Sequence, residues 1–228
     1  RGDLVIELES ETGEHHENVA CALKAARHCA EVVEGALVVP RDSISYFYNG
    51  GKSFYLIIPQ RTLGLPDCVE LNVIYERVAR HIRDNMDEKY RGMVDMSLYN
   101  HDRPLRIPGT THPKYGLYNT RLTTEEFFNL AAQDIIRLAR LPRETANGEL
   151  HFEDSAASAS IVHELTKDIP RTESFDSTRK PLRINMAKKN WHAKTISYLR
   201  ERGLPARIPC AETLTALIHS GGHTGFEG

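Results

Sequence analysis

A β-hairpin is the most clearly marked element of this sequence. Residues 43–48 and 53–58 are short runs rich in β-branched and aromatic side chains, and Asn49-Gly50-Gly51-Lys52 separates them. Asn-Gly is a strong hairpin signal, because both residues tolerate the left-handed backbone of a tight turn. We therefore expect an antiparallel strand pair here, and the fold must include a sheet.

The segments on either side of the hairpin alternate between strand-like and helical patterns. An apolar run suited to a buried strand comes first, and the later helices show apolar residues at helical spacing or a capping box. In chain order we predict a strand at 4–8, a helix at 17–34 ending near Gly35, a helix at 70–86, a strand at 92–98, and a helix from the Thr123–Glu126 capping box to about Leu141. This order predicts an α/β or α+β fold in which helices flank a mixed sheet.

Three parts are expected along the chain. Residues 1–141 contain the alternating elements and should form a compact core. Residues 142–178 are polar and rich in Ser, Thr and Ala, which is typical of a linker or flexible excursion, with one helix around 159–167. Residues 179–228 are basic at first, and their pattern indicates a small helical C-terminal segment.

Composition narrows the class of protein. The chain has 228 residues, 40% of them apolar, and no apolar run approaches the about 20 residues that span a bilayer. A membrane protein is therefore not expected. The four cysteines show no CxxC pairing, so a reducing cytoplasm is the expected location.

The net charge of −2 conceals two oppositely charged segments. Residues 1–19 carry six acidic side chains against one basic, whereas residues 179–207 carry nine Lys or Arg against one acid. Cations and an aromatic ring in the basic segment could hold template phosphates and stack a base of single-stranded DNA. The DNA-binding candidates are Lys188, Lys189, Trp191 and Lys194. A solvated helix face is the alternative.

Three acidic residues are candidates for binding a metal ion. Glu7 and Glu9 are two apart on the first predicted strand, so their carboxylates should lie side by side on one face. Adjacent like charges are costly, but a divalent cation such as Mg²⁺ or Mn²⁺ between them would balance the charge. Asp95 stands at the end of a second apolar run. The alternative for Glu7 and Glu9 is a strand end that faces water.

Two segments are candidates for binding phosphate. In the hairpin turn, Gly50 and Gly51 allow close approach of the backbone, and Lys52 and Ser53 add a cation and a hydroxyl. Farther along, a proline-stiffened loop would hold several cationic or cationizable groups against a polyanion. These residues are Arg103, Arg106, His112 and Lys114. The alternatives are an ordinary hairpin turn and a solvated basic loop.

The order of these segments resembles the archaeo-eukaryotic primase superfamily, which includes primase-polymerases and the polymerase domains of bacterial end-joining ligases. The resemblance covers roughly residues 3–128 and is carried by four segments. They are VIELES, YNGGKSFYLII, RGMVDMSLYN and RPLRIPGTTHPKYG. The resemblance implies a primase-polymerase catalytic core with an RRM-like sheet over residues 1–141. It also implies a role in replicating a mobile element, with an attached or associated helicase.

The resemblance further implies a reaction and the residues that carry it. Glu7, Glu9 and Asp95 would bind two Mg²⁺ or Mn²⁺ ions for nucleotidyl transfer by a DNA primase or DNA polymerase. Single-stranded or primed DNA would serve as the template. The residues that would hold the incoming nucleoside triphosphate are Lys52, Ser53, Tyr55, Arg103, Arg106, His112 and Lys114.

Two positions depart from the pattern of this superfamily. Glu7 stands where an aspartate is usual, and Tyr55 stands where the SxH signature has a histidine. Tyr55 cannot be cationic and would contact phosphate only through its hydroxyl. A catalytically weakened or inactive primase-like domain that binds nucleotide or DNA is therefore the alternative. A nucleotide-binding regulator or a nuclease of unrelated fold is a third hypothesis.

Overall fold

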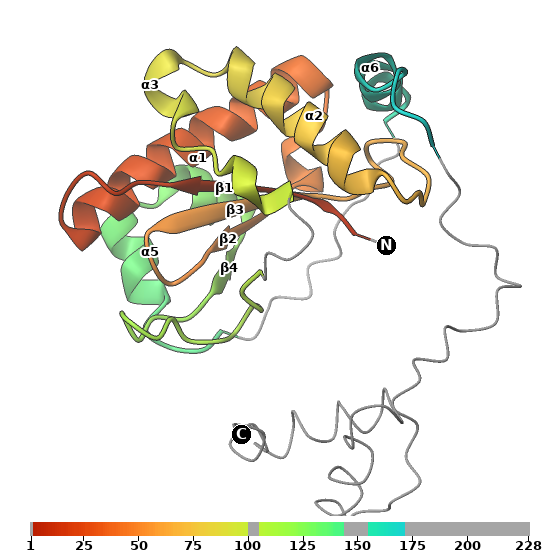
Figure 1. Cartoon of the computed structure of the whole chain (residues 1–228). Coiled ribbons are helices and arrows are strands. Elements are labelled where there is room, and N and C mark those ends of the chain that lie inside the picture. The colour runs from red at the N-terminus through yellow and green to blue at the C-terminus, as the bar shows by residue number, and fades with distance from the viewer. Residues whose placement is uncertain (1, 100–104, 144–154, 172–228) are drawn as a thin grey trace, which may run out of the picture. The chain divides into compact units, whose positions relative to one another are not determined.

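The computed structural model describes residues 2–99, 105–143 and 155–171 (Figure 1). Within these residues, four strands form one sheet in the order β1-β3-β2-β4, and each neighbouring pair is antiparallel. The strands are β1 (Leu4–Glu9), β2 (Ser45–Tyr48), β3 (Ser53–Ile58) and β4 (Thr120–Leu122). The predicted hairpin is confirmed as β2 and β3, and the combination of this sheet with helices is of the α+β class.

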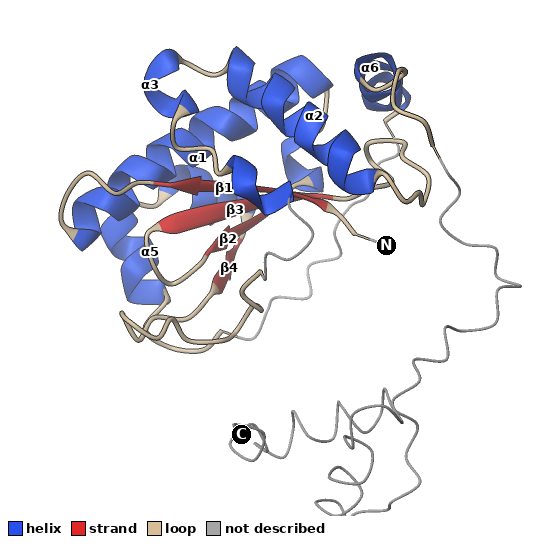
Figure 2. Ribbon diagram, viewed as in Figure 1, coloured by secondary structure: helices blue, strands red, loops and turns tan. Residues whose placement is uncertain are grey.

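The two longest helices cover one face of this sheet (Figure 2). α1 packs directly on β1 and β3, and α2 packs on α1. In chain order the helices are α1 (His15–Leu37), α2 (Leu71–Asn85), α3 (Glu88–Arg91), α4 (Thr124–Asn129), α5 (Ala132–Leu138) and α6 (Ala156–Leu165), with the 3-10 turns η1 (Arg41–Ser43) and η2 (Met96–Tyr99). Among the described residues, none of these helices has the length and apolar character needed to cross a membrane.

The side chains of β1 alternate between an apolar face and a polar face of the sheet. Leu4, Ile6 and Leu8 are fully buried in the core beneath the helices. Successive side chains of a strand point to opposite faces, so Glu7 and Glu9 project from the other face, which we call the site face. The shared face predicted for these two carboxylates is therefore present.

An aromatic cluster joins α4 to the helix-bearing face. The fully buried ring of Phe127 stacks on Tyr46 of β2, with ring centroids 4.1 Å apart, and meets Phe54 of β3 edge-on. The predicted capping box begins this helix. Thr123 Oγ1 accepts a hydrogen bond from Glu126 N, and the Glu126 carboxylate accepts one from Thr123 N.

The sheet is not mixed, contrary to what the strand–helix–strand order suggested. β1 and β2 do run in the same direction, but β3 lies between them and is antiparallel to both. The strand predicted at 92–98 is also wrong, since only Val94 forms a bridge, to Leu8. Pairing ends at Asp95, because its Oδ1 accepts hydrogen bonds from both N and Oγ of Ser97 at the start of η2.

Two helix boundaries differ from the predictions. α1 continues through Gly35 to Leu37, whose side chain is fully buried in the core. The helix predicted to reach Leu141 is divided into α4 and α5, because Leu130 leaves the helical conformation. Arg27 of α1 donates hydrogen bonds to the carbonyl oxygens of Phe127 (2.6 Å) and Leu130 (2.5 Å), which satisfies the end of α4.

Helix α6 lies inside the segment predicted as a linker, residues 142–178. It packs on α1 and α2, and its Val162 is fully buried. Gly64, on the loop after β3, approaches Ala159 of this helix so closely that it leaves no room for a side chain. The compact unit built on the sheet therefore extends beyond the predicted boundary at residue 141.

Candidate active site

Strand register places the three predicted metal ligands on the same face. Leu8 of β1 bridges Val94, with Asp95 N donating to Glu7 O and Glu9 N donating to Met93 O, both at 2.9 Å. Residues directly opposite each other on paired segments share a face. Asp95 is therefore opposite Glu7 and joins Glu7 and Glu9 on the site face.

A polar and aromatic row crosses the site face at the level of Glu7. Tyr55 of β3 is opposite Glu7, Phe47 of β2 is opposite Tyr55, and Arg121 of β4 is opposite Phe47. Tyr55 is buried within this row. Tyr55 is thus a direct cross-strand neighbour of the first carboxylate, Glu7.

Each of the three carboxylates contacts a protein group. Glu7 is buried, and its Oε1 accepts a hydrogen bond of 2.5 Å from Ser53 Oγ. Glu9 Oε1 lies 3.0 Å from Lys52 Nζ. Asp95 Oδ1 accepts from the backbone and side chain of Ser97. In the described part of the chain, no three or more His, Cys, Asp or Glu side chains are gathered closely enough to hold a metal ion.

The hairpin turn is held by its own hydrogen bonds and by α1. Asn49 Oδ1 accepts from Gly51 N at 2.7 Å, and the Asn49 amide donates to Ser53 Oγ. The carbonyl oxygen of Gly51 accepts from Tyr48 OH at 2.6 Å and from His15 Nε2 at 2.9 Å. The turn therefore presents Lys52 and Ser53 from a backbone with fixed partners.

The predicted basic loop lies against this turn. Gly50 has a positive φ of 78°, and a Cβ there would lie 2.4 Å from Leu117 O. A Cβ on Gly51 would lie 2.7 Å from His112 Nε2. Glycine is required at Gly50 both for its backbone conformation and for the close approach of the loop. The structure thus brings together the two segments that were separate phosphate-binding candidates.

Aromatic rings also contact one another where the hairpin turn meets the basic loop, a region that we call the junction. Tyr115 stacks on His15 with ring centroids 4.0 Å apart and an interplanar angle of 26°, and it lies 5.0 Å from the ring of His112. Lys114 Nζ lies 5.2 Å from the centroid of the same Tyr115 ring. His15 and Tyr115 were not among the predicted site residues: His15 lies in none of the quoted segments, and Tyr115, although it lies in RPLRIPGTTHPKYG, has no charge that would mark it for phosphate.

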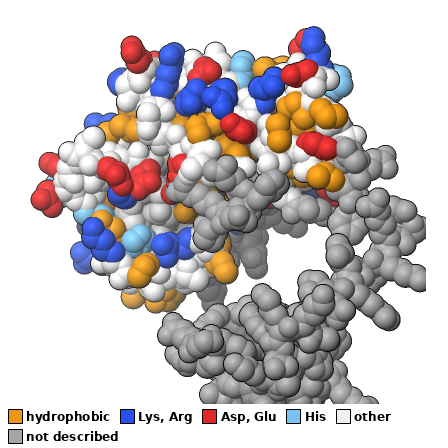
Figure 3. Space-filling model, in the orientation of Figure 1, with side chains coloured by type: hydrophobic (Ala, Val, Ile, Leu, Met, Phe, Trp, Pro, Cys, Tyr) orange, Lys and Arg blue, Asp and Glu red, His pale blue; other side chains and the backbone are white. Residues whose placement is uncertain are grey.

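The junction has a positive electrostatic environment. Burial lowers the pKa of His112 below its usual 6.5, and the nearby charges of Arg106, His15 and Lys114 lower it further. Burial does not attract an anion, but the positive charges of Arg106 and Lys114 do. Figure 3 shows acidic side chains close to basic and histidine side chains at the left of the molecule, the side on which β1 ends in Figure 1.

Several predicted site residues lie outside the described residues. They are Arg103 of the basic loop and the DNA-binding candidates Lys188, Lys189, Trp191 and Lys194. The residues that the structure brings into one region are the hairpin turn, the loop from Arg106 to Lys114, and the site-face carboxylates at the end of β1.

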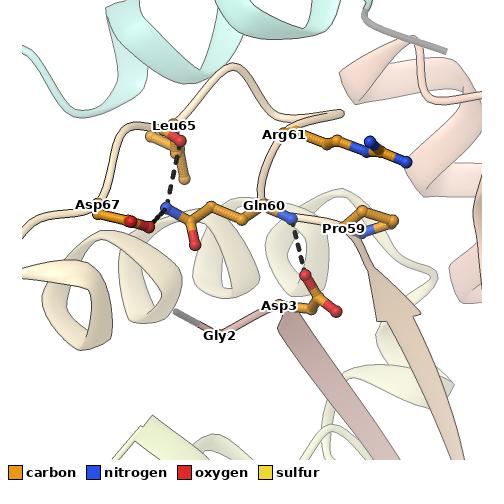
Figure 4. Close-up of a pocket in the computed structure, with 7 residues that line it drawn as sticks. All are labelled: Gly2, Asp3, Pro59, Gln60, Arg61, Leu65 and Asp67. Atoms are coloured by element: carbon orange, nitrogen blue, oxygen red, sulfur yellow. Dashed lines mark hydrogen bonds between the residues drawn. The ribbon is translucent and has the colours of Figure 1, made fainter. Parts of the chain in front are cut away.

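A separate pocket of about 640 Å³ lies at the opposite end of β1 (Figure 4). Gln60 connects its two carboxylates, since its backbone N donates to Asp3 Oδ1 at 3.1 Å and its side-chain amide donates to Asp67 Oδ1 at 3.0 Å. Asp3 therefore lies away from Glu9. Its side chain contributes to this pocket instead.

Comparisons with protein-family models, with curated proteins and with solved structures found no match to this chain. Its function must therefore be inferred from its own residues.

Proposed function

We propose that this protein is a primase-polymerase that transfers nucleotides to a growing strand on single-stranded DNA. The observation that carries the proposal is the placement of Glu7, Glu9 and Asp95 in register on one face of the sheet. The cation-rich junction of turn and basic loop lies beside the end of β1. Carboxylates next to a phosphate-binding cluster are the parts that nucleotidyl transfer needs.

The topology of the described residues supports the same proposal. β3 lies between β1 and β2, and helices cover one face, as in the RRM-like core that the sequence resemblance implies. The chain returns after α2 to the free side of β1, where Val94 bridges Leu8. This return is what delivers Asp95 to Glu7.

The carboxylates have the donor chemistry for Mg²⁺ or Mn²⁺, which prefer oxygen ligands. Glu7, Glu9 and Asp95 would hold the ions, although in the structure the three are not gathered into a metal-binding group and Ser53 and Lys52 contact the first two. The side chains would therefore have to exchange these partners on binding metal. A metal bound there would stabilise the charge that develops on the attacking oxygen and the leaving pyrophosphate.

The residues of the junction would neutralise and position the triphosphate. Arg106 and Lys114 supply permanent positive charge, and His112 supplies a charge whenever it is protonated. The rigid turn fixes where Lys52 and Ser53 approach the phosphates. Catalysis of this type depends mainly on positioning and electrostatic stabilisation.

The test is a template-directed assay with the full chain. We expect it to extend a primer, or to synthesise one, on single-stranded DNA when supplied with nucleoside triphosphates and Mg²⁺ or Mn²⁺. Deoxyribonucleotides and ribonucleotides are supplied in separate reactions. Absence of product with every combination of metal and nucleotide, while the chain is folded, would contradict the proposal.

The pairing of Lys52 with Glu9 favours a second candidate, a primase-like domain that binds nucleotide or DNA without catalysis. A lysine already balances one of the carboxylates, and Tyr55 cannot supply the charge of a histidine. This candidate predicts triphosphate binding without product. The variants Glu7→Asp and Tyr55→His should then create activity that the natural chain lacks.

His112 should make triphosphate binding dependent on pH. Its depressed pKa means that it is neutral near pH 7 in the free protein, and a bound polyanion would raise that pKa. Binding should therefore take up a proton, and affinity should increase as pH falls from the pKa of His112 in the complex toward its lower pKa in the free protein, by up to about tenfold for each unit by which the pKa rises. Calorimetry with inorganic triphosphate at pH 7.5 and 5.5 measures this change.

His112→Gln is the matched control for this measurement, because inorganic triphosphate itself also changes its protonation with pH. The ratio of affinities, natural chain to variant, should increase on acidification. A ratio that does not change with pH would show that His112 carries no charge toward the ligand. In the free protein the same depressed pKa works against folding, so the contribution of His112 to stability decreases as pH falls below 6.5.

A further inference from the structure

We propose that Tyr115 stacks on the base of the nucleoside triphosphate whose phosphates bind at the junction. This role rests on the proposed function and adds a contact that distinguishes a nucleotide from a polyanion without a base. The residues predicted to hold the triphosphate were chosen for its phosphates, and none of them was assigned to its base.

The Tyr115 ring is held in a fixed orientation. It stacks on the ring of His15, the first residue of α1, with centroids 4.0 Å apart and an interplanar angle of 26°. His15 in turn contacts the hairpin turn through Gly51 O at 2.9 Å. The backbone around Tyr115 forms a closed turn, because Gly116 N donates to His112 O at 2.8 Å. A ring held in this way loses little freedom when a ligand stacks on it.

Cationic and cationizable side chains lie against this ring. Lys114 Nζ lies over it, 5.2 Å from the centroid, and the His112 ring lies 5.0 Å away. The charges that lower the pKa of His112 are all positive and come from Arg106, His15 and Lys114. Tyr115 is partly exposed, and the flexible Lys114 side chain can move from the ring to a phosphate. An aromatic ring among cations is the combination that binds a stacked base together with its phosphates.

Tyr90 on α3 contacts the same types of side chain in a different electrostatic environment. The His28 ring lies 5.3 Å away, and Lys89 Nζ lies 4.7 Å from the Tyr90 centroid. Carboxylates balance these groups, since His28 lies 3.7 Å from both Glu31 and Asp87, and Lys89 lies 3.4 Å from Asp87. The two acids would repel a triphosphate. Tyr90 therefore has the ring contacts without the positive environment, which makes it the matched control.

The experiment measures binding to the full chain by calorimetry, with EDTA present and without template. Tyr115→Leu should bind adenosine triphosphate at least about fivefold more weakly than the natural chain, because the base loses its stacking partner. Its affinity for inorganic triphosphate, which has no base, should be unchanged. Tyr115→Phe keeps the ring, and Tyr90→Leu changes a ring elsewhere, so both should bind the two ligands like the natural chain.

Three results would overturn the inference. They are no binding of adenosine triphosphate by the natural chain, equal affinity for it in the natural chain and Tyr115→Leu, and an equal loss for both ligands in this variant. The last result would mean that the ring supports the loop and does not contact the base.

An oligothymidylate without triphosphate tests the other source of a base, the template strand. Tyr115→Leu should bind it like the natural chain, and a loss confined to this ligand would assign the ring to the template and overturn the inference. Failure of this role is distinguishable from failure of the proposed function. Primer extension by the natural chain, with normal binding of adenosine triphosphate in Tyr115→Leu, rejects only the stacking role. Binding that depends on Tyr115, without any extension, rejects only the polymerase.

Discussion

Asp95→Asn is expected to reduce nucleotide incorporation by on the order of a hundredfold or more. Asparagine keeps the shape of the side chain, and its oxygen can still accept the two hydrogen bonds from Ser97 that begin η2. It removes the negative charge that the proposed centre places opposite Glu7. The loss should therefore appear in activity, with the thermal unfolding midpoint nearly unchanged. Primer extension and thermal melting of the same preparation measure the two effects.

The matched control for this variant is Asp84→Asn. Asp84 is an exposed aspartate on α2 that pairs with Arg83, and exposed ion pairs contribute little to stability. It should retain full activity. Equal product from Asp95→Asn and the natural chain would remove the proposed role of the site-face carboxylates.

Gly50→Ala is expected to have the largest structural effect at the site. The alanine would have to adopt a φ of 78°, and its Cβ would lie 2.4 Å from Leu117 O. The left-handed backbone alone costs about 1–2 kcal/mol, and the clash with a backbone atom must separate the turn from the basic loop. We expect a loss of more than about 2 kcal/mol in the free energy of unfolding. Binding of triphosphate should also be lost.

Gly116→Ala isolates the contribution of the clash. Gly116 also has a positive φ, of 66°, but a Cβ there meets nothing within 4 Å. Its cost should be that of the backbone alone, about 1–2 kcal/mol. Chemical denaturation of both variants gives the comparison. Equal destabilisation would mean that the turn and the loop are not in the close contact described here.

Short-range patterns predicted much of the fold correctly. The hairpin at Asn49-Gly50, the capping box of Thr123 and Glu126, and the helix found as α2 all depend on residues a few positions apart. The shared face of Glu7 and Glu9 follows from strand alternation alone. Each of these features needs only the backbone geometry of one segment, which is why sequence spacing was sufficient.

One error came from a local side-chain contact, and another came from a contact between distant segments. The strand predicted at 92–98 has the right composition, but the Asp95 side chain bonds to Ser97 and turns the chain into η2. The division between α4 and α5 depends on Arg27, which lies on another helix. An isolated apolar run or a helical period contains no information about such partners.

For this protein, the sequence by itself determined the hairpin, the alternation of β1 and the types of residue available for binding metal and phosphate. Only the tertiary structure decided which of them meet. Pairing of Val94 with Leu8 places Asp95 opposite Glu7, the close approach at Gly50 joins the turn to the basic loop, and Lys52 lies beside Glu9 and Glu11. The physical reason is that local backbone preferences act over a few residues. Hydrogen bonds, packing and charge pairs between distant segments form only when the whole sheet and its helices assemble.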